Sequence, residues 1–412
     1  MIHKLPFLKT DGTDIVDANG RRVVLKGVSL GGWLMMEGYM FGGRNIAERM
    51  LKESIEKALG RDALDDFIRS FRDTFVREED VKTIKGWGAN CIRIPFNYRL
   101  IEFEDRPFSL NEEGLEYLDR AIGWCQKHGI YCILDMHAAP GSQNPAWHSD
   151  SSGAVELFAS EVNRDRYFRL WHFLATRYKD VSAVAGYDVL NEPVLPFHQE
   201  YILKDLYEKV TGEIRDVDKK HIIFLEGNFW AQKLDFLGKP RDPNTAYSIH
   251  TYAPLNFTHN YIPGLRYPGK AYSITWNKEA FSLLARPYRA FAEASGVPLY
   301  MGEFGVNARG GYYGEYEWVD DMISIFEKNG MSWTYWTYKT VANYALPDGI
   351  FRYTDNPPWV HREGPVSGCE TFPGLWAKEK GRMIFSWRTE SFEPNGKLLS
   401  VLRKHFRGTK KK

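Results

Sequence analysis

The chain has little cysteine, little net charge and no long apolar run. Its four cysteines, Cys91, Cys125, Cys132 and Cys369, show no metal-like spacing, and we expect buried free thiols rather than disulfides. The 54 basic and 53 acidic residues leave a formal charge of +1. This balance gives no support for nucleic acid or an anionic membrane as a partner. No apolar run reaches the roughly 18 residues of a membrane-spanning helix, so no membrane span is expected.

The first seven residues also lack the apolar stretch of a secretory signal. Together with the free thiols, this predicts a cytoplasmic location, or a secreted one if the sequence is a trimmed mature form. The sequence carries no indication of the oligomeric state.

Aromatic residues, in contrast, are abundant. They make up 15% of the chain, with 13 Trp and 23 Tyr, and hydrophobic residues make up 43%. That fraction is enough for a large core, which alone would account for the aromatic content. Aromatic faces also stack on the apolar C–H faces of sugar rings, so the composition fits a carbohydrate site equally well.

Strand-like apolar runs alternate with amphipathic helical stretches over most of the length. The predicted strands are 23–30, 90–96, 131–137, 184–191, 222–227, 246–251, 298–302 and 332–338. The predicted helices are 45–59, 63–75, 79–87, 115–128, 164–178, 201–216, 279–295, 316–329 and 396–406. Eight successive β-then-α units predict an α/β fold, a single (β/α)8 TIM barrel. No linker or repeat interrupts it, so we expect one domain over residues 1–406 and a disordered basic tail over 407–412.

Three long connections interrupt the regular alternation. They cover residues 138–163, 252–277 and 339–394, after predicted strands three, six and eight. All three follow the carboxyl ends of strands, the face on which barrel enzymes build their sites. Long ordered loops in a compact domain are usually functional, so we expect these three to form the walls of a pocket.

Two short segments each place a glutamate at the end of an apolar run. They are Val189-Leu190-Asn191-Glu192-Pro193 and Tyr300-Met301-Gly302-Glu303-Phe304-Gly305. A turn-forming residue follows each glutamate, Pro193 directly and Gly305 one residue later. Hydrolysis of a β-glycoside needs two such carboxyls, one as acid and one as nucleophile. The pair therefore predicts a retaining glycosidase.

The chemistry of that reaction assigns roles to residues at the predicted strand ends. A nucleophile must stay ionised, so Arg93 and Tyr252 are candidates to orient Glu303. The other carboxyl must hold a proton near neutral pH, so Glu192 is the candidate acid/base, with a raised pKa. Asn191 is placed to donate to the 2-hydroxyl of the sugar.

Further residues at these ends are candidates to bind the sugar. Trp336 is a candidate floor under the reacting ring, and His137 and His250 are candidates to hydrogen-bond hydroxyls or the carboxyls. Trp230 and Trp147 are either sugar-stacking platforms or packing residues. Tyr39 and His198 are weaker candidates of the same kind.

Between residues 23 and 338, the ordered set resembles glycoside hydrolase family 5. The residues that carry the resemblance are Arg93, His137, Asn191-Glu192-Pro193, His250, Tyr252, Glu303 and Trp336. The resemblance implies that Glu192 is the acid/base and Glu303 the nucleophile, with retention of configuration and carboxyls about 5–5.5 Å apart. It implies a β-linked oligosaccharide as substrate, and no cofactor or metal is expected.

Two segments, 27–37 and 135–144, are similar to those of exo-β-1,3-glucanases within this family. In that group, the glutamate that matches Glu37 and polar residues that include Asn144 close the non-reducing end of the pocket. Glu37 is alternatively a solvated loop residue. Segments 145–150 and 348–374 do not follow the pattern of the group, which leaves the linkage specificity open.

These features predict an exo-acting enzyme that hydrolyses gluco-configured β-oligosaccharides from the non-reducing end. The alternatives are a β-mannosidase and an endo-β-glucanase or mannanase on the same scaffold. A metal-dependent hydrolase barrel is disfavoured because no His-x-His pair follows the first strand. A non-enzymatic glycan-binding barrel is disfavoured because both carboxyls are present.

Overall fold

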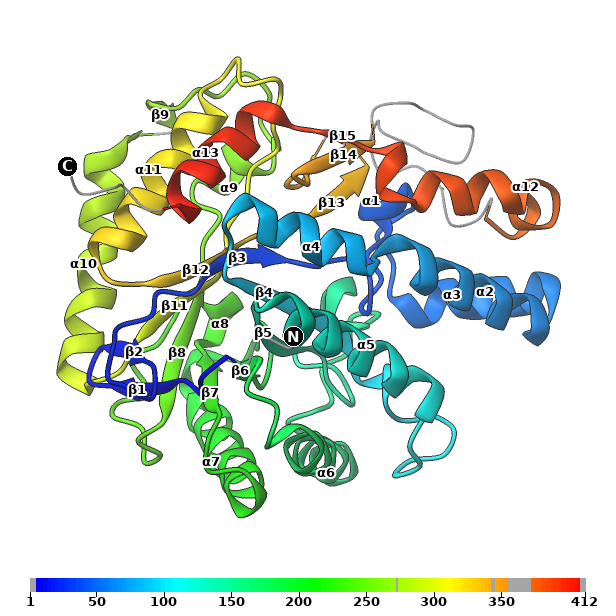
Figure 1. Cartoon of the computed structure of the whole chain (residues 1–412), viewed down its shortest axis with the longest axis horizontal. Helices are drawn as coiled ribbons and strands as arrows, with labels where there is room; N and C mark the ends of the chain where they lie inside the picture. Colours follow the sequence, from blue (N-terminus) through cyan, green and yellow to red (C-terminus); the bar gives the residue numbers. More distant parts are fainter. Residues whose placement is uncertain (1–4, 272, 342–344, 354–371, 408–412) are drawn as a thin grey trace.

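A closed barrel of eight parallel strands forms the centre of the molecule (Figure 1). The computed structural model describes residues 5–271, 273–341, 345–353 and 372–407. Around the barrel, the strands are β3 (Lys26–Ser29), β4 (Cys91–Asn97), β5 (Tyr131–Ala138), β6 (Val184–Asp188), β7 (Ile222–Glu226), β8 (Thr245–His250), β11 (Leu299–Glu303) and β12 (Ser332–Tyr335), and β12 pairs with β3 to close the ring. The predicted (β/α)8 fold is confirmed.

Helices surround the barrel, as Figure 1 shows. They include α4 (Glu78–Trp87), α5 (Glu112–His128), α6 (Glu161–Tyr178), α7 (Glu200–Val217), α10 (Lys278–Ser295), α11 (Glu315–Lys328) and α13 (Gly396–Phe406). Local signals set several of their ends. The Asn111 side chain accepts a hydrogen bond from the Gly114 N–H at the start of α5, and Gly129 ends that helix with a positive φ of 62°.

A second group of helices packs beside the barrel, on the right in Figure 1. It consists of α2 (Glu48–Leu59) and α3 (Arg61–Phe75), which follow the first strand, and of α12 (Phe372–Trp387). Phe67 of α3 contacts the rings of Trp376 and Trp387 of α12. The sequence analysis did not predict α12, which lies inside the connection 339–394.

Other short elements were also missed. They are α1 (Gly38–Phe41), α8 (Asn228–Ala231), α9 (Leu255–Thr258), the strand pairs β1 (Lys9–Asp11) with β2 (Asp14–Val16) and β9 (Gly269–Ala271) with β10 (Ile274–Trp276), and the small sheet β13 (Lys339–Val341), β14 (Phe351–Tyr353) and β15 (Glu393–Pro394). Runs of two to four residues are too short for a hydrophobic period to reveal them.

Two predicted strands end earlier than expected. The fourth barrel strand, β6, stops at Asp188 instead of continuing to Asn191, and the eighth, β12, stops at Tyr335. Asn191 and Glu192 therefore project from the turn after β6. The connection after β7 holds only α8, in which Phe229 and Trp230 have left-handed backbone angles.

The barrel is filled at its amino-terminal end. Leu8 and Ile15, from the N-terminal segment, pack against a cluster of inward-facing strand residues that includes Cys91, Phe224 and Tyr300. This leaves the carboxyl ends of the strands for a cavity. Cys91, Cys125 and Cys132 are buried free thiols as expected, whereas Cys369 lies outside the described residues.

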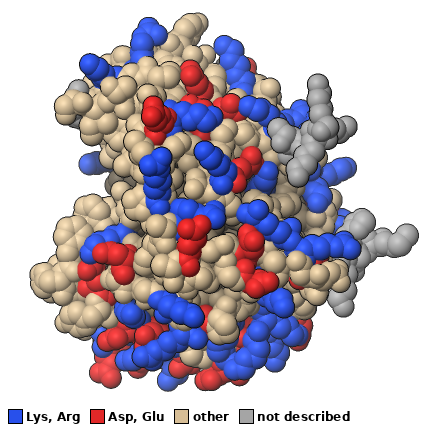
Figure 2. All heavy atoms as spheres, turned by 90° about the vertical axis from the view of Figure 1, so that its left-hand side faces the viewer, with Lys and Arg blue, Asp and Glu red and all other residues tan. Residues whose placement is uncertain are grey.

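Figure 2 shows Lys and Arg intermixed with Asp and Glu over one face, without a large patch of one sign. No helix in the described part of the chain is long and apolar enough to cross a bilayer. Residues 408–412 of the predicted basic tail lie outside the described residues, as do 354–371 of the connection 339–394.

Candidate active site

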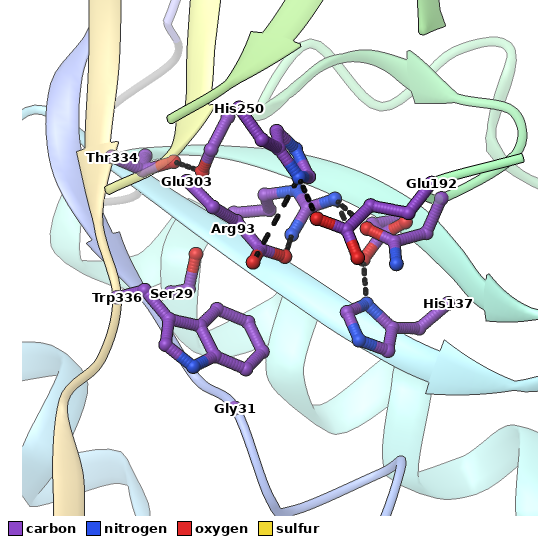
Figure 3. Close-up of polar contacts among 12 residues, drawn as sticks. Ser29, Gly31, Arg93, His137, Glu192, His250, Glu303, Thr334 and Trp336 are labelled. Carbon is purple, nitrogen blue, oxygen red and sulfur yellow. Dashed lines mark hydrogen bonds and ion pairs between the residues drawn. The ribbon is translucent and has the colours of Figure 1, made fainter. Parts of the chain in front are cut away.

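A cavity of about 670 Å³ opens at the carboxyl ends of the barrel strands. Glu192 and Glu303 both line it, and one carboxyl oxygen of each lies within 4.8 Å of the other. Figure 3 shows these two side chains, His250 and Arg93 converging at the strand ends. Further residues named from the sequence that line the cavity are Glu37, Tyr39, His137, Trp147, Trp230, His250, Tyr252 and Trp336.

Two hydrogen bonds hold the Glu303 carboxylate. Arg93 donates from Nη1 to Oε1 at 2.6 Å, and the Tyr252 hydroxyl donates to Oε2 at 2.8 Å. These are the two residues predicted to orient Glu303. Both carboxylate oxygens of Glu303 are thereby fixed in place as acceptors.

Arg93 is fully buried and does not line the cavity. Its remaining nitrogens contact Asp188, Asp135 and Glu226 at 3.1, 3.1 and 3.2 Å, and Nη2 donates to Asn191 Oδ1 at 2.7 Å. A buried guanidinium is stable only when its charge and its donors are satisfied in this way. Arg93 therefore acts on a bound molecule through the residues that it holds.

Glu192 has an unusual backbone conformation, with a positive φ of 47°. For a residue with a side chain this costs roughly 1–2 kcal/mol, and two hydrogen bonds hold the residue in place. Its N–H donates to Glu226 Oε2 at 2.6 Å, and its carbonyl oxygen accepts from Asn144 Nδ2 at 3.0 Å. The turn after β6 thereby aims the Glu192 side chain into the cavity.

His250 lies between three carboxylates. Its Nδ1 donates to Glu192 Oε1 at 2.9 Å, and its Nε2 lies 3.1 Å from Glu226. Burial alone would lower the pKa of His250, but the charges of Glu226 and Glu303 and the hydrogen bond to Glu192 raise it well above its ordinary value. The surrounding carboxylates therefore favour the charged form of the imidazole.

The pKa of Glu192 moves in the opposite direction. Burial alone would raise it, but the hydrogen bond and charge of His250, with a smaller effect of His148, lower the pKa of Glu192 to about 2. The predicted raised pKa is thus wrong for the unliganded site. The reason is the hydrogen bond and the charge of the neighbouring His250 imidazole, both of which favour the ionised Glu192 carboxyl.

Glu37 lies at one end of the cavity, with only 4% of its surface exposed. Burial, followed by the charges of Glu303 and Glu192, raises the pKa of Glu37 well above its usual range. Its Oε1 is buried without a hydrogen-bond partner among the described residues, 3.9 Å from His137 Nε2. The interpretation of Glu37 as a solvated loop residue is therefore wrong.

Trp336 and His137 form the floor of this end. Their rings are nearly parallel, at 6° with centroids 5.5 Å apart, and Trp336 Nε1 donates to the Tyr39 hydroxyl at 2.9 Å. His137 donates from Nδ1 to Asp135 at 2.7 Å. Burial lowers the pKa of His137 to about 4, so the ring is neutral near pH 7.

A second group of aromatic residues in the cavity follows β5 and β7, and His148 of this group contacts the His137 ring at 5.7 Å. Trp147 and Trp230 both line the cavity, with the His148 ring between them at 5.3 and 5.5 Å. Three successive residues with left-handed backbone, Phe229, Trp230 and Ala231, shape the turn that presents Trp230. Strained turns of this kind are concentrated at functional sites.

Three predicted contacts with substrate need correction. Asn144 is fully buried and lines no part of the cavity, because its amide is used to hold the Glu192 carbonyl and the Ala146 N–H. Arg93 is also fully buried and does not line the cavity. His198 is exposed on the short helix Phe197–Gln199 and does not reach the cavity.

The sequence analysis missed Glu226 and His148. Glu226 is the last residue of β7 and contacts Arg93, His250 and the Glu192 N–H. The rule that selected polar residues at strand ends would also have found it. His148 Nε2 lies 3.5 Å from Glu192 Oε2. His148 belongs to a loop, and no local sequence pattern there indicates a functional residue.

Glu192, His250 and Glu303 also present ligand-type atoms within 4.8 Å of one another, a spacing that could hold a metal ion. Hydrogen bonding already accounts for the arrangement, because His250 is bonded to Glu192 while Arg93 and Tyr252 donate to Glu303.

A parallel barrel with two carboxyls facing each other at its carboxyl end defines a glycoside hydrolase, and comparison with known proteins agrees. Residues 66–341 match the family model described as Cellulase (glycosyl hydrolase family 5). This match covers more than half of the chain. The chain belongs to glycosyl hydrolase family 5.

Relatives within the family carry different names. A beta-xylosidase of Phanerodontia chrysosporium is 36% identical over 82% of this chain and 72% of its own length. Endoglucanase C of Acetivibrio thermocellus is 30% identical over 66% of this chain and 87% of its own. A probable glucan 1,3-beta-glucosidase A of Aspergillus fumigatus is 26% identical over 79% of this chain and 84% of its own length. Among solved structures, endoglucanase Cel5A of Thermotoga maritima aligns with a TM-score of 0.61 at 19% identity, over 92% of this chain and 96% of its own, which supports the fold.

The contacts of Glu226 generate a prediction about pH dependence. In Glu226→Gln, the charge that raises the pKa of His250 is lost, so that pKa falls and the imidazole loses its proton at lower pH. We expect the alkaline limb of the rate profile to move to lower pH and the hydrolysis rate to fall on the order of 10- to 100-fold, because Glu192 is also held less firmly.

The measurement is kcat/KM on an aryl β-glycoside from pH 4 to 9. Glu116→Gln, at an exposed position of α5, is the matched control. A folded Glu226→Gln protein with an unshifted profile and an unchanged rate would refute the link between Glu226 and the proton on His250.

Proposed function

We propose that the protein is a retaining β-glycosidase in which Glu303 is the nucleophile and Glu192 the acid/base. The observation that carries this proposal is the pair of carboxyls within 4.8 Å, each fixed by its own partners. Retaining enzymes hold their carboxyls about 5–5.5 Å apart, whereas inverting enzymes leave about 6.5–9.5 Å for a water. The separation supports the retaining class.

In the first step, Glu303 attacks the anomeric carbon and forms a glycosyl ester while the bond to the leaving oxygen breaks. That oxygen takes a proton from Glu192. In the second step, water attacks the anomeric carbon and gives its proton to Glu192, and Glu303 is released as a carboxylate. Arg93 and Tyr252 support both steps, because they stabilise the free carboxylate.

The acid in this scheme is a pair of residues. The proton rests on His250 Nδ1, which is hydrogen-bonded to Glu192 Oε1 at 2.9 Å. When a glycosidic oxygen approaches Glu192, the proton passes along this hydrogen bond to the carboxyl and from there to the leaving group. After the ester forms, Glu303 no longer carries a charge, which favours a free Glu192 carboxylate as the base.

Asn191 is suited to bind the 2-hydroxyl of the sugar. Asn191 is fully buried and is not itself among the residues that line the cavity, but it directly precedes Glu192, which does. Arg93 holds Asn191 Oδ1, whereas Asn191 Nδ2 is buried without a partner among the described residues. A donor with no protein partner is ready for a substrate oxygen, and a bond to the 2-hydroxyl strengthens in the transition state. Trp336 forms the floor under the ring.

We infer that the enzyme removes a terminal, gluco-configured residue from a β-linked oligosaccharide. Glu37 and Tyr39 line the cavity at the end beyond Trp336, where a buried carboxyl oxygen without a partner is suited to the outer hydroxyls of a terminal sugar. The relatives named beta-xylosidase and glucan 1,3-beta-glucosidase support this proposal, since xylose and glucose share the ring configuration.

Endo action is the second candidate, because the relative named endoglucanase C is 30% identical over two thirds of the chain. A β-mannosidase or a mannanase is the other alternative. Its sugar differs from glucose only in the configuration at the carbon that carries the 2-hydroxyl. Product analysis and the choice of sugar in the experiments below distinguish the candidates.

Glu303→Gln is expected to lose several orders of magnitude in kcat, because an amide cannot form the glycosyl ester. The measurement is the initial rate on aryl β-D-glucoside, β-D-xyloside and β-D-mannoside, which also shows the preferred sugar. Glu317→Gln, exposed on α11, is the control. Near wild-type activity of Glu303→Gln would remove the central assignment.

Glu192→Ala is expected to slow glycosides with poor leaving groups far more than activated aryl glycosides, because a good leaving group needs little protonation. The comparison uses a dinitrophenyl glycoside and a disaccharide of the same sugar. Equal losses on both would contradict the role of Glu192 as acid.

Glu37→Ala is expected to weaken binding of the terminal sugar and to change the products from a tetrasaccharide. The wild type should release monosaccharide first, and the variant a mixture of shorter oligosaccharides. Chromatography of early products is the measurement, with Glu53→Ala on α2 as an exposed control. If the wild type itself releases mixed oligosaccharides from the start, the enzyme is endo-acting.

A further inference from the structure

One wall of the cavity has a different chemistry from the catalytic end. It is formed by the connection after β8, which contributes Ala253, Pro254, Leu255, Asn256, His259, Tyr261, Ala271, Ile274 and Trp276 to the lining. We call this set the β8 wall. It lines the same cavity as Tyr252, Glu192 and Glu303.

The β8 wall carries no Asp, Glu, Lys or Arg among its lining residues. Its histidine, His259, is neutral near pH 7, because burial lowers the pKa of His259 to about 4, and its Nδ1 already contacts the Thr258 hydroxyl at 3.1 Å. In contrast, the catalytic end presents Glu37, Glu192 and Glu303. The two ends therefore suit different chemical groups.

Large apolar side chains of this wall are also exposed. Leu255, Tyr261 and Ile274 each leave 51% of their surface accessible while lining the cavity. Exposed apolar side chains that gather at a cavity mark a binding groove more often than chance. Ile274 belongs to the hairpin β9–β10, which holds it at the cavity together with Ala271 and Trp276.

We propose that the β8 wall binds the leaving group of the substrate and that this group is the apolar part of an alkyl, terpenyl or aryl alcohol. The natural substrate class is then the β-glycosides of hydrophobic alcohols. This inference rests on the proposed function, since the sugar must occupy the catalytic end for its leaving group to reach the wall.

A second sugar is a poorer match for these side chains. Each sugar hydroxyl taken from water needs a hydrogen-bond partner, or its burial is costly. Leu255, Ile274, Pro254 and the two alanines offer carbon alone, so the polar side-chain atoms of the wall are limited to those of Asn256, His259, Tyr261 and Trp276. Trp147 Nε1 is a buried donor without a partner among the described residues, but Trp147 belongs to the connection after β5 and not to the β8 wall. An apolar chain instead gains stability with every methylene that it buries on the β8 wall.

The test is kcat/KM for a series of alkyl β-glycosides, from ethyl to octyl, of the sugar that the enzyme prefers. The alcohols in this series are similar as leaving groups. Differences in kcat/KM along the series therefore reflect burial of the alkyl chain. Each buried methylene is expected to raise kcat/KM by about two- to fourfold. All measurements are made below the concentration at which the longer glycosides form micelles.

The variants Leu255→Asn and Ile274→Asn should reduce the ratio of the octyl to the ethyl rate at least several-fold. Leu284→Asn is the matched control, because Leu284 is also 51% exposed but lies on α10 and does not line the cavity. The octyl-to-ethyl rate ratio of Leu284→Asn should equal that of the wild type.

A flat chain-length series, or a ratio that Ile274→Asn and Leu255→Asn leave unchanged, would overturn the inference. A disaccharide hydrolysed far faster than the octyl glycoside would also overturn it and would assign the wall to a second sugar. These outcomes would not affect the proposed glycosidase activity, because the comparison of Glu303→Gln with the wild type on aryl glycosides tests that activity separately. If no glycoside is cleaved at all, the proposed function fails instead.

Discussion

The site depends on one buried cation. Arg93 is fully buried within hydrogen-bond or ion-pair distance of Asp135, Asp188, Glu226 and Glu303. These four carboxyls come from the ends of four strands, so the guanidinium links β5, β6, β7 and β11 to its own strand β4. If the arginine were removed, several buried carboxylates would lose their counterion, which is among the most destabilising changes a core can undergo.

Arg93 alone does not balance this concentration of acid. Burial raises the pKa of Asp135 to about 7 and that of Asp188 well above its usual range, although Arg93 opposes both shifts. The charges of Glu226 and Glu303 and the hydrogen bond to Glu192 raise the pKa of His250, although burial opposes that shift. The ionisation of the site is therefore a property of the whole cluster.

The described cavity divides into two regions with separate physical tasks. The polar end, with Glu37, Glu192 and Glu303, is suited to hydroxyls and to developing charge. The β8 wall is suited to apolar surface. The β8 wall comes from the single connection after β8, whereas Glu37, Glu192 and Glu303 follow three other barrel strands or end them.

The sequence by itself determined the barrel, because the period of two in strands and the longer period of helices are local patterns. It also identified both carboxyls and the pair that holds Glu303, since strand ends converge on one rim in any such barrel. Glu226, at the end of β7, could have been predicted in the same way, as a polar residue at a strand end, but the sequence analysis missed it.

Only the tertiary structure decided the directions in which the pKa values of Glu192 and His250 shift, because these depend on neighbours from other strands. It also decided that Glu37 is buried, that Asn144 holds backbone instead of substrate, and that the wall after β8 is apolar. Each of these depends on contacts between residues far apart in the chain, which no local pattern encodes.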